Sequence, residues 1–412
     1  MQTFIRAAVC ALMVAAAGAA QAAETIRIAL IDPLSGPEAE LGQSAFRHLS
    51  AAVDFANLNG GALGLKLEVV PFDNQGRPEQ SLEALRQSIE RGIRLVAQGV
   101  GSDVARALMA AVNEHNERNP GRSVLLINVG AGDPALTGAE CSYWHFRFDA
   151  HLDMKAQVLA GAIARNPAIE SVYLVNRDNA AGRRFAAEAA RLLPERRAGL
   201  RIAGSELHAG DARDFAPIAA RIAASGAHAV ATANIGEDLA ALLRAARKAG
   251  VDASFYTLHA EHAGTPQALA QLAPVDVRNV TAWHPNIEGN RLDLFAAGYR
   301  ALAGENWHRL PVYLAVHMLV TAMETARGLE PARIVAVLEG LSFLGPNGPI
   351  AMRKEDHQLL QPLFIARLAK IDANAVSLHP DVKDYGWVTE ARVDTEATVL
   401  PTDCRMARPG RR

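Results

Sequence analysis

The sequence predicts an α/β protein with two doubly wound lobes, each built on a parallel sheet. Apolar, β-branched runs alternate with segments of helical periodicity from Thr25 onward, which is the pattern of a parallel sheet covered by helices on both faces. The alternation starts again at Ser171. Without its expected signal peptide the chain has about 390 residues, more than a single hydrophobic core usually serves.

Residues 1–22 predict a secretory signal peptide. A short segment with one positive charge, Met1 to Arg6, precedes the apolar run from Ala7 to Ala20, and small residues follow at Ala20 and Ala22. The run is too short to span a membrane, and no later stretch reaches about 18 uninterrupted apolar residues. We therefore expect cleavage after Ala22 and release of the mature chain.

The first lobe is expected to alternate strands and helices up to about residue 128. In order, the expected elements are strand Thr25–Ile31, helix Gly42–Asn59, strand Leu65–Phe72, helix Pro78–Arg91, strand Ile93–Gln98, a helix ending at Asn116 and strand Val124–Asn128.

The second lobe is expected to follow an aromatic-rich crossing segment, Tyr143–Phe148. Its expected elements are strand Ser171–Asn176, a helix to Leu193, strand Arg201–Leu207, helix Phe215–Ser225, strand Ala229–Thr232, helix Gly236–Ala249 and strand Ser254–Leu258. A second crossing is expected at Val280–Pro285 and a third before a late strand, Pro362–Leu368.

Three further helices, Arg291–Ala303, Pro311–Arg327 and Pro331–Leu341, are expected to pack back on the first lobe. The resulting division assigns residues 24–148 and 284–340 to the first lobe, 149–283 and 341–370 to the second, and 371–412 to a C-terminal tail.

Two cysteines, Cys141 and Cys404, remain after signal cleavage, and an even number in an exported protein predicts a disulfide. In the chain-entropy model, closing so long a loop stabilises the fold by about 4–5 kcal/mol. Two free buried thiols are the alternative.

The strand-end turn Gly99–Ser102 is the first candidate ligand-binding segment. Glycines let a backbone approach a ligand closely, and Ser102 or Asp103 is expected to cap the following helix, whose N–H groups attract anions. Ser35 and the segment Val129–Asp133 follow other strands of the same sheet, and ligands of such sheets bind beyond the carboxyl ends of the strands.

Other chemistries are poorly supported. The composition, 50% hydrophobic and 21% charged with a formal charge of −2, provides no field that would attract nucleic acid or an acidic membrane. Val104 stands where a dinucleotide fingerprint needs its third glycine. The histidines at 151, 208, 259, 262 and 284 lack metal-ligand spacing and are interpreted as scattered surface residues. We expect no cofactor and no metal.

The chain resembles the periplasmic solute-binding proteins of ABC transporters, of the branched-chain amino acid-binding type. The resemblance covers almost the whole mature chain and rests on these segments: Ile28–Gly42, Asn59–Gly64, Asp73-Asn74, Gly99–Ser102, Asp133–Thr137 and Phe146-Arg147. It implies the type I periplasmic binding fold, in which two doubly wound parallel-sheet lobes joined by a three-segment hinge close on a small ligand.

The resemblance also implies roles for particular residues. A ligand carboxylate is expected at Ser102 and at the backbone of Gly130, Ala131 and Gly132. For the ligand amine the candidates are Glu261, then Asp149 or Asp153. Two further second-lobe candidates are Asn234 and Asp178. A helix cap by Asp178 or Asn179 is the alternative for the latter.

Family members often carry aromatic residues in loops where this chain has Glu40-Leu41, Ala180–Gly182 and Ala231–Asn234. Trp144 and Trp283 lie in the crossing segments and are interpreted as hinge packing rather than as replacements.

The sequence therefore predicts a non-enzymatic, monomeric periplasmic receptor that captures an amino acid-like solute and delivers it to an inner-membrane ABC permease. A ligand-sensing module for a membrane receptor and a secreted α/β enzyme are the alternatives.

Overall fold

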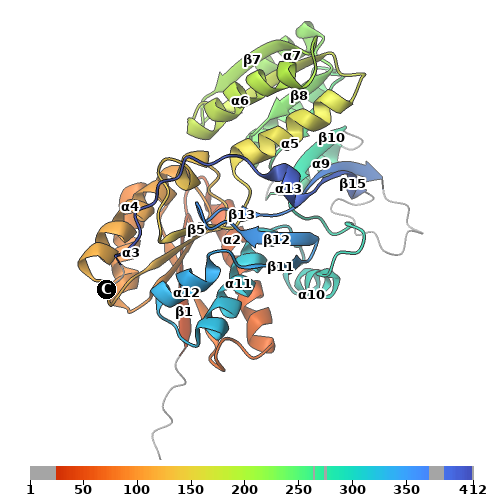
Figure 1. Ribbon diagram of the computed structural model, residues 1–412. Coiled ribbons are helices and arrows are strands. Elements are labelled where there is room, and N and C mark those ends of the chain that lie inside the picture. Colours follow the sequence, from red (N-terminus) through yellow and green to blue (C-terminus); the bar gives the residue numbers. More distant parts are fainter. Residues whose placement is uncertain (1–24, 263–264, 273–275, 371–384, 411–412) are drawn as a thin grey trace, which may run out of the picture.

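The computed structural model describes residues 25–262, 265–272, 276–370 and 385–410, and these residues form two lobes (Figure 1). The expected signal peptide, residues 1–22, lies outside the described residues. Within the described ranges, every helix is too short or too polar to cross a membrane.

The first lobe is built on a five-stranded sheet in the order β2-β1-β3-β4-β5, with every neighbouring pair parallel. Its strands are β1 (Ile26–Asp32), β2 (Leu67–Asp73), β3 (Leu95–Gln98), β4 (Leu125–Asn128) and β5 (His145–Arg147). Its helices are α2 (Ala39–Leu58), α3 (Pro78–Glu90), α4 (Ser102–Arg118) and the short 3₁₀ helix η1 (Pro134–Thr137). The strands β3 and β4 are buried along their whole length, as a sheet covered on both faces requires.

The second lobe contains a seven-stranded sheet in the order β15-β14-β10-β9-β8-β6-β7. Its strands are β6 (Ser171–Arg177), β7 (Arg201–His208), β8 (Ala229–Thr232), β9 (Ser254–Thr257), β10 (Val277–Thr281), β14 (Leu363–Lys370) and β15 (Tyr385–Val393). Its helices are α5 (Leu152–Arg165), α6 (Ala180–Arg196), α7 (Ala216–Ser225), α8 (Glu237–Lys248) and α9 (Thr265–Leu272). The late strand expected near residues 362–368 is confirmed as β14, which pairs antiparallel with β10. The predicted α/β fold of two parallel-sheet lobes is therefore confirmed.

The helices after the second crossing return to the first lobe, as expected. They are α10 (Asp293–Ala303), α11 (Leu310–Ala326) and α12 (Pro331–Leu338). Phe55 of α2 contacts Phe295 of α10, with ring centroids 5.0 Å apart. A small sheet follows, made of β11 (Ser342–Gly345), β12 (Gly348–Met352) and β13 (Leu359–Leu360). It adjoins the first lobe, because the Arg147 N–H donates to the His357 carbonyl oxygen at 2.9 Å.

The C-terminal segment contacts both lobes. Residues 385–393, within the expected tail, form β15 on the edge of the second sheet. After α13 (Thr395–Thr398) the chain returns to the first lobe (Figure 1), where Arg408 forms an ion pair with Glu339, directly after α12. The predicted disulfide is confirmed: Cys404 is bonded to Cys141, with the two Cα atoms 5.6 Å apart.

Candidate functional site

A cleft of about 360 Å³ lies between the two lobes, at the carboxyl ends of the central strands. Seven of the nine predicted ligand-binding residues line it: Ser102, Gly130, Ala131, Gly132, Asp149, Asn234 and Glu261. The other two, Asp153 and Asp178, do not line this cleft.

The turn Gly99–Ser102 presents an uncapped helix end to the cleft. The expected cap by Ser102 or Asp103 is wrong: the N-cap residue is Gly101, with φ 89°, and no side chain accepts a hydrogen bond from the first turn of α4. Only glycine adopts this backbone conformation readily. The first N–H groups of α4 therefore remain available to an anion, which the helix dipole also attracts.

The neighbouring turn after β4 leaves two backbone groups without a protein partner. The N–H groups of Gly130 and Ala131 both donate to Asn128 Oδ1, at 3.0 and 2.8 Å. Among the described residues, the Gly132 N–H and the Gly130 carbonyl oxygen have no hydrogen-bond partner. Ser102 Oγ accepts from the Asp133 N–H at 3.2 Å, so its own O–H can still donate.

The two turns lie in close contact, which explains the glycine at position 130. A Cβ atom on Gly130 would lie 2.7 Å from the Gly99 carbonyl oxygen. Asp32 holds the turn after β3 in place: its Oδ1 accepts hydrogen bonds from the Gly99 and Val100 N–H groups at 3.0 and 2.9 Å.

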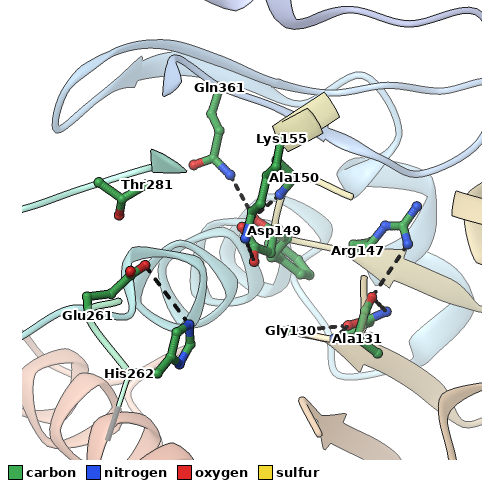
Figure 2. A network of polar contacts seen from close by, with 12 residues as sticks. Gly130, Ala131, Arg147, Asp149, Ala150, Lys155, Glu261, His262, Thr281 and Gln361 are labelled. Atoms are coloured by element: carbon green, nitrogen blue, oxygen red, sulfur yellow. Dashed lines mark hydrogen bonds and ion pairs between the residues drawn. The ribbon is translucent and has the colours of Figure 1, made fainter. Parts of the chain in front are cut away.

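Acidic side chains gather opposite these turns (Figure 2). Asp149 Oδ1 accepts from the Ala150 N–H, and its Oδ2 lies 2.7 Å from Lys155 Nζ. Glu261 accepts a hydrogen bond from Asn279 Nδ2. Burial raises the pKa of Glu261 to about 7, so this carboxyl group has too few partners in the ligand-free cleft to favour its charged form.

Several lining residues were not predicted, among them Lys155, Arg177 and Arg309. Arg177 joins the lobes, since its Nη1 lies 3.4 Å from Glu38 Oε1 of the first lobe and its Nε lies 2.7 Å from Asp238 Oδ2 of the second. Arg177 ends β6 immediately before the predicted Asp178, so strand-end reasoning came within one position of it.

The second-lobe candidates have other partners. Asp153 forms an ion pair with Arg184, and both line an adjoining cavity of about 480 Å³, which shares Ser102, Leu152 and Ala180 with the cleft. Asp178 pairs with exposed Arg183. The alternative of a helix cap holds for Asn179, which accepts from the Gly182 N–H at 2.8 Å.

Asn234 is buried in the cleft wall. Its Oδ1 lies 3.1 Å from His208 Nε2, and its Nδ2 has no partner in the described ranges. Neither Trp144 nor Trp283 lines the cleft. Trp283 is buried in the core, in agreement with the interpretation as packing.

The interpretation of the histidines as surface residues is wrong. His151, His208 and His284 are all less than 9% exposed, and His151 caps α5 by accepting from the Met154 N–H. His259 and His262 line the cleft. Over the described part of the chain, no three or more His, Cys, Asp or Glu side chains are placed to hold a metal ion.

Two α/β lobes with a polar cleft between them, joined by crossing segments, define a hinged solute-binding protein. A model of the periplasmic binding protein family matches residues 25–374, and the chain belongs to this family. The resemblance drawn from the sequence is thus confirmed, and the chain functions as the substrate-binding component of an ABC transporter, which captures a small solute.

Relatives with the same architecture carry amino acid-binding names. The chain is 28% identical to "Leu/Ile/Val-binding protein homolog 4" of Brucella abortus, over 100% of both chains. It is 25% identical to the leucine-, isoleucine-, valine-, threonine- and alanine-binding protein of Pseudomonas aeruginosa, over 79% of this chain and 85% of that one. The crystal structure of the protein of that same name from Brucella ovis, in a closed conformation, matches with a TM-score of 0.83 and 26% identity. It covers 94% of this chain and all of its own.

Proposed function

We propose that the captured solute is a zwitterionic amino acid, with its α-carboxylate bound by the first lobe and its ammonium group bound by acidic side chains. The observation that carries this proposal is that free hydrogen-bond donors and carboxylates lie at different places in the same cleft. Unshared donors lie on the turns after β3 and β4, and carboxylates lie at Asp149 and Glu261. The names of the relatives support the same class of ligand.

The carboxylate site consists of three kinds of donor. They are the Ser102 O–H, the Gly132 N–H and the first N–H groups of α4. Hydrogen bonds to an ionised carboxylate are stronger than neutral ones, and a helix N-terminus adds the attraction of its dipole. A closed cleft excludes water and strengthens each of these interactions.

The ammonium site consists of acceptors. Glu261 is the principal group, because the ammonium would supply the positive partner that its buried carboxylate lacks. Asp149 has its charge already compensated by Lys155, so its contribution is smaller. The Gly130 carbonyl oxygen accepts no hydrogen bond from the described residues and is the third acceptor. Each of the three ammonium protons would then have one acceptor.

We further propose that binding occurs without chemical conversion and that the mature monomer, exported to the periplasm through its signal peptide, delivers the solute to an inner-membrane ABC permease. The relatives support this, since they are named as binding proteins. Mass spectrometry of a bound amino acid after prolonged incubation should recover it unchanged. A product that accumulates in proportion to protein and time would overturn this part.

Substitution of Ser102 tests the carboxylate site. Ser102→Ala removes one hydrogen bond to a charged group and should weaken the tightest-binding member of an L-amino acid panel by about 1–3 kcal/mol, measured by titration calorimetry. Ser205→Ala is the matched control, because Ser205 is exposed on β7, away from the cleft. Equal affinities for the Ser102 and Ser205 variants would exclude Ser102 from the site.

A further inference from the structure

One wall of the cleft carries nitrogen atoms that neither the α-carboxylate nor the ammonium group of an amino acid would contact in the proposed arrangement. Leu41, His308 and Arg309 of the first lobe and His262 of the second lobe line this wall, which we call the donor wall. Arg309 is only 6% exposed and is the N-cap residue of α11, so the amino-terminal end of that helix also points to the wall.

Arg309 is a buried cation without a direct acidic partner. Its Nη2 donates to the Leu41 carbonyl oxygen at 3.3 Å, a long hydrogen bond, and its Nε has no partner among the described residues. In the same ranges, no carboxylate lies within 4.0 Å of its nitrogens. A guanidinium group only donates, so its remaining N–H groups require an acceptor from elsewhere.

The nearby acids do not pair directly with Arg309. Burial lowers the pKa of Arg309, and the charges of Asp32, Asp149 and Glu261 oppose this shift. Asp32 Oδ1 accepts from two backbone N–H groups of the turn after β3, and its Oδ2 has no partner in the described ranges. Asp149 is paired with Lys155, and Glu261 is bonded to Asn279 and lies 4.0 Å from His262 Nε2. These acids influence Arg309 from a distance, and none occupies its hydrogen-bonding positions.

The two histidines of the donor wall approach each other across the cleft. The ring centroids of His262 and His308 are 5.7 Å apart, and His262 Nδ1 and His308 Nε2 are both buried without a hydrogen-bond partner in the described part of the chain. Burial lowers the pKa of His308 to about 4 and that of His262 well below its usual value. Both rings are therefore neutral near pH 7 and carry one N–H each. His308 Nδ1 lies 3.3 Å from the Asn306 carbonyl oxygen, so its proton is used there and its Nε2 can only accept, whereas His262 Nδ1 can donate to a ligand.

The donor wall does not suit an apolar ligand side chain, although other parts of the lining, such as Val100, Leu152 and Ile235, are apolar. An aliphatic ligand side chain on the donor wall would remove water from Arg309 and give it no acceptor in return, which is unfavourable for a buried charge.

We infer that the solute is an acidic amino acid, whose side-chain carboxylate is bound by Arg309 beside His262. This inference rests on the proposed function, which places the α-carboxylate and the ammonium at other groups of the same cleft. A carboxylate accepts two parallel hydrogen bonds from a guanidinium fork, and a remaining lone pair can accept from His262 Nδ1.

A matrix of four five-carbon acids separates the two claims. L-glutamate carries the amine and the second carboxylate, L-norvaline only the amine, glutarate only the second carboxylate, and pentanoate neither. Titration calorimetry with the mature chain should show that L-glutamate binds at least tenfold tighter than L-norvaline, and glutarate tighter than pentanoate. The four-carbon set, L-aspartate, L-2-aminobutyrate, succinate and butyrate, covers a shorter ligand in the same way.

Arg309→Met removes the guanidinium and retains a long side chain. It should abolish the advantage of the second carboxylate in both pairs, while Arg309→Lys should retain part of it. Arg201→Met, at an exposed position at the start of β7, is the matched control and should leave all four affinities unchanged. If Arg309→Met fails to fold, the ligand matrix on the unaltered protein still decides.

The outcomes distinguish the two claims. If L-norvaline binds as tightly as L-glutamate and both bind more tightly than glutarate, the acidic side chain is refuted and the amino acid proposal stands. If glutarate equals L-glutamate and both exceed L-norvaline, the amino acid proposal fails and the role of Arg309 stands. If no ligand of either set binds, the acidic side chain is refuted, and the L-amino acid panel used for Ser102→Ala decides the amino acid proposal.

Discussion

The carboxyl group of Glu261 should couple ligand binding to pH. In the ligand-free cleft burial raises its pKa from 4.5 to about 7, which corresponds to about 3 kcal/mol in disfavour of the charged form. The sign follows from linkage: between pH 4.5 and pH 7 the folded protein holds a proton that the unfolded chain has released, so folding stability falls as pH rises through this interval. An ammonium group bound beside Glu261 reverses the preference, because it stabilises the carboxylate.

An amine-bearing ligand should therefore bind more weakly as the pH falls below about 7. For a single group with this pKa, the affinity should decrease about 30-fold between pH 8 and pH 5.5. Calorimetry in two buffers of different ionisation enthalpy should also detect release of a proton on binding near pH 7. Burial likewise raises the pKa of Asp32 to about 7, so a variant is needed to assign the effect.

Glu261→Gln provides that assignment. The neutral amide keeps an acceptor for Asn279 Nδ2 and removes the titration. This variant should bind an amino acid more weakly at pH 8 and show little change between pH 8 and pH 5.5. Its ligand-free form should be more stable than the unaltered protein at pH 8, by up to about 3 kcal/mol. An unaltered protein whose affinity is the same at both pH values would refute the assignment of the ammonium to Glu261.

Two further variants test the architecture that supports the cleft. Gly130→Ala places a Cβ atom 2.7 Å from the backbone oxygen of the adjoining turn, and it should lower both the melting temperature and the ligand affinity. Gly121→Ala, whose Cβ atom has no neighbour within 4 Å, is its control, and equal losses in the two variants would show that close packing of the turns is unimportant. Cys404→Ser opens a disulfide that spans 263 residues and should reduce the free energy of unfolding by at most about 4–5 kcal/mol in denaturant titrations. No difference from the unaltered protein, both measured without reductant, would show that the bond does not constrain the unfolded chain.

Strand-end reasoning located much of the candidate cleft from the sequence. In a doubly wound sheet, the residues after each strand meet at one edge whatever the details of packing, so Ser102 and Gly130 could be placed together without coordinates. Glu261 follows a strand of the other sheet, and its candidacy came from the resemblance to the family. The same reasoning could not decide which groups remain unshared. Asn128 takes up the N–H groups of Gly130 and Ala131, and this depends on how one side chain folds back on its own turn.

The sequence by itself determined the features that arise from local periodicity and from covalent chemistry. These are the repeated α/β pattern, the return of the late strand to the second lobe and the single pair of cysteines outside the expected signal peptide. Such features depend on which residues neighbour each other along the chain, and hydrophobic periodicity reports that directly.

Only the tertiary structure decided the chemistry of the donor wall. Arg309 and His262 come from different lobes and line the same cleft, and Asp153 pairs with Arg184 in an adjoining cavity. The strength of a buried charge depends on distances between atoms that are remote in the chain. For that reason the sequence could indicate only a cleft for a charged solute. The position of Arg309 in the structure was needed to infer that this solute carries a second carboxylate.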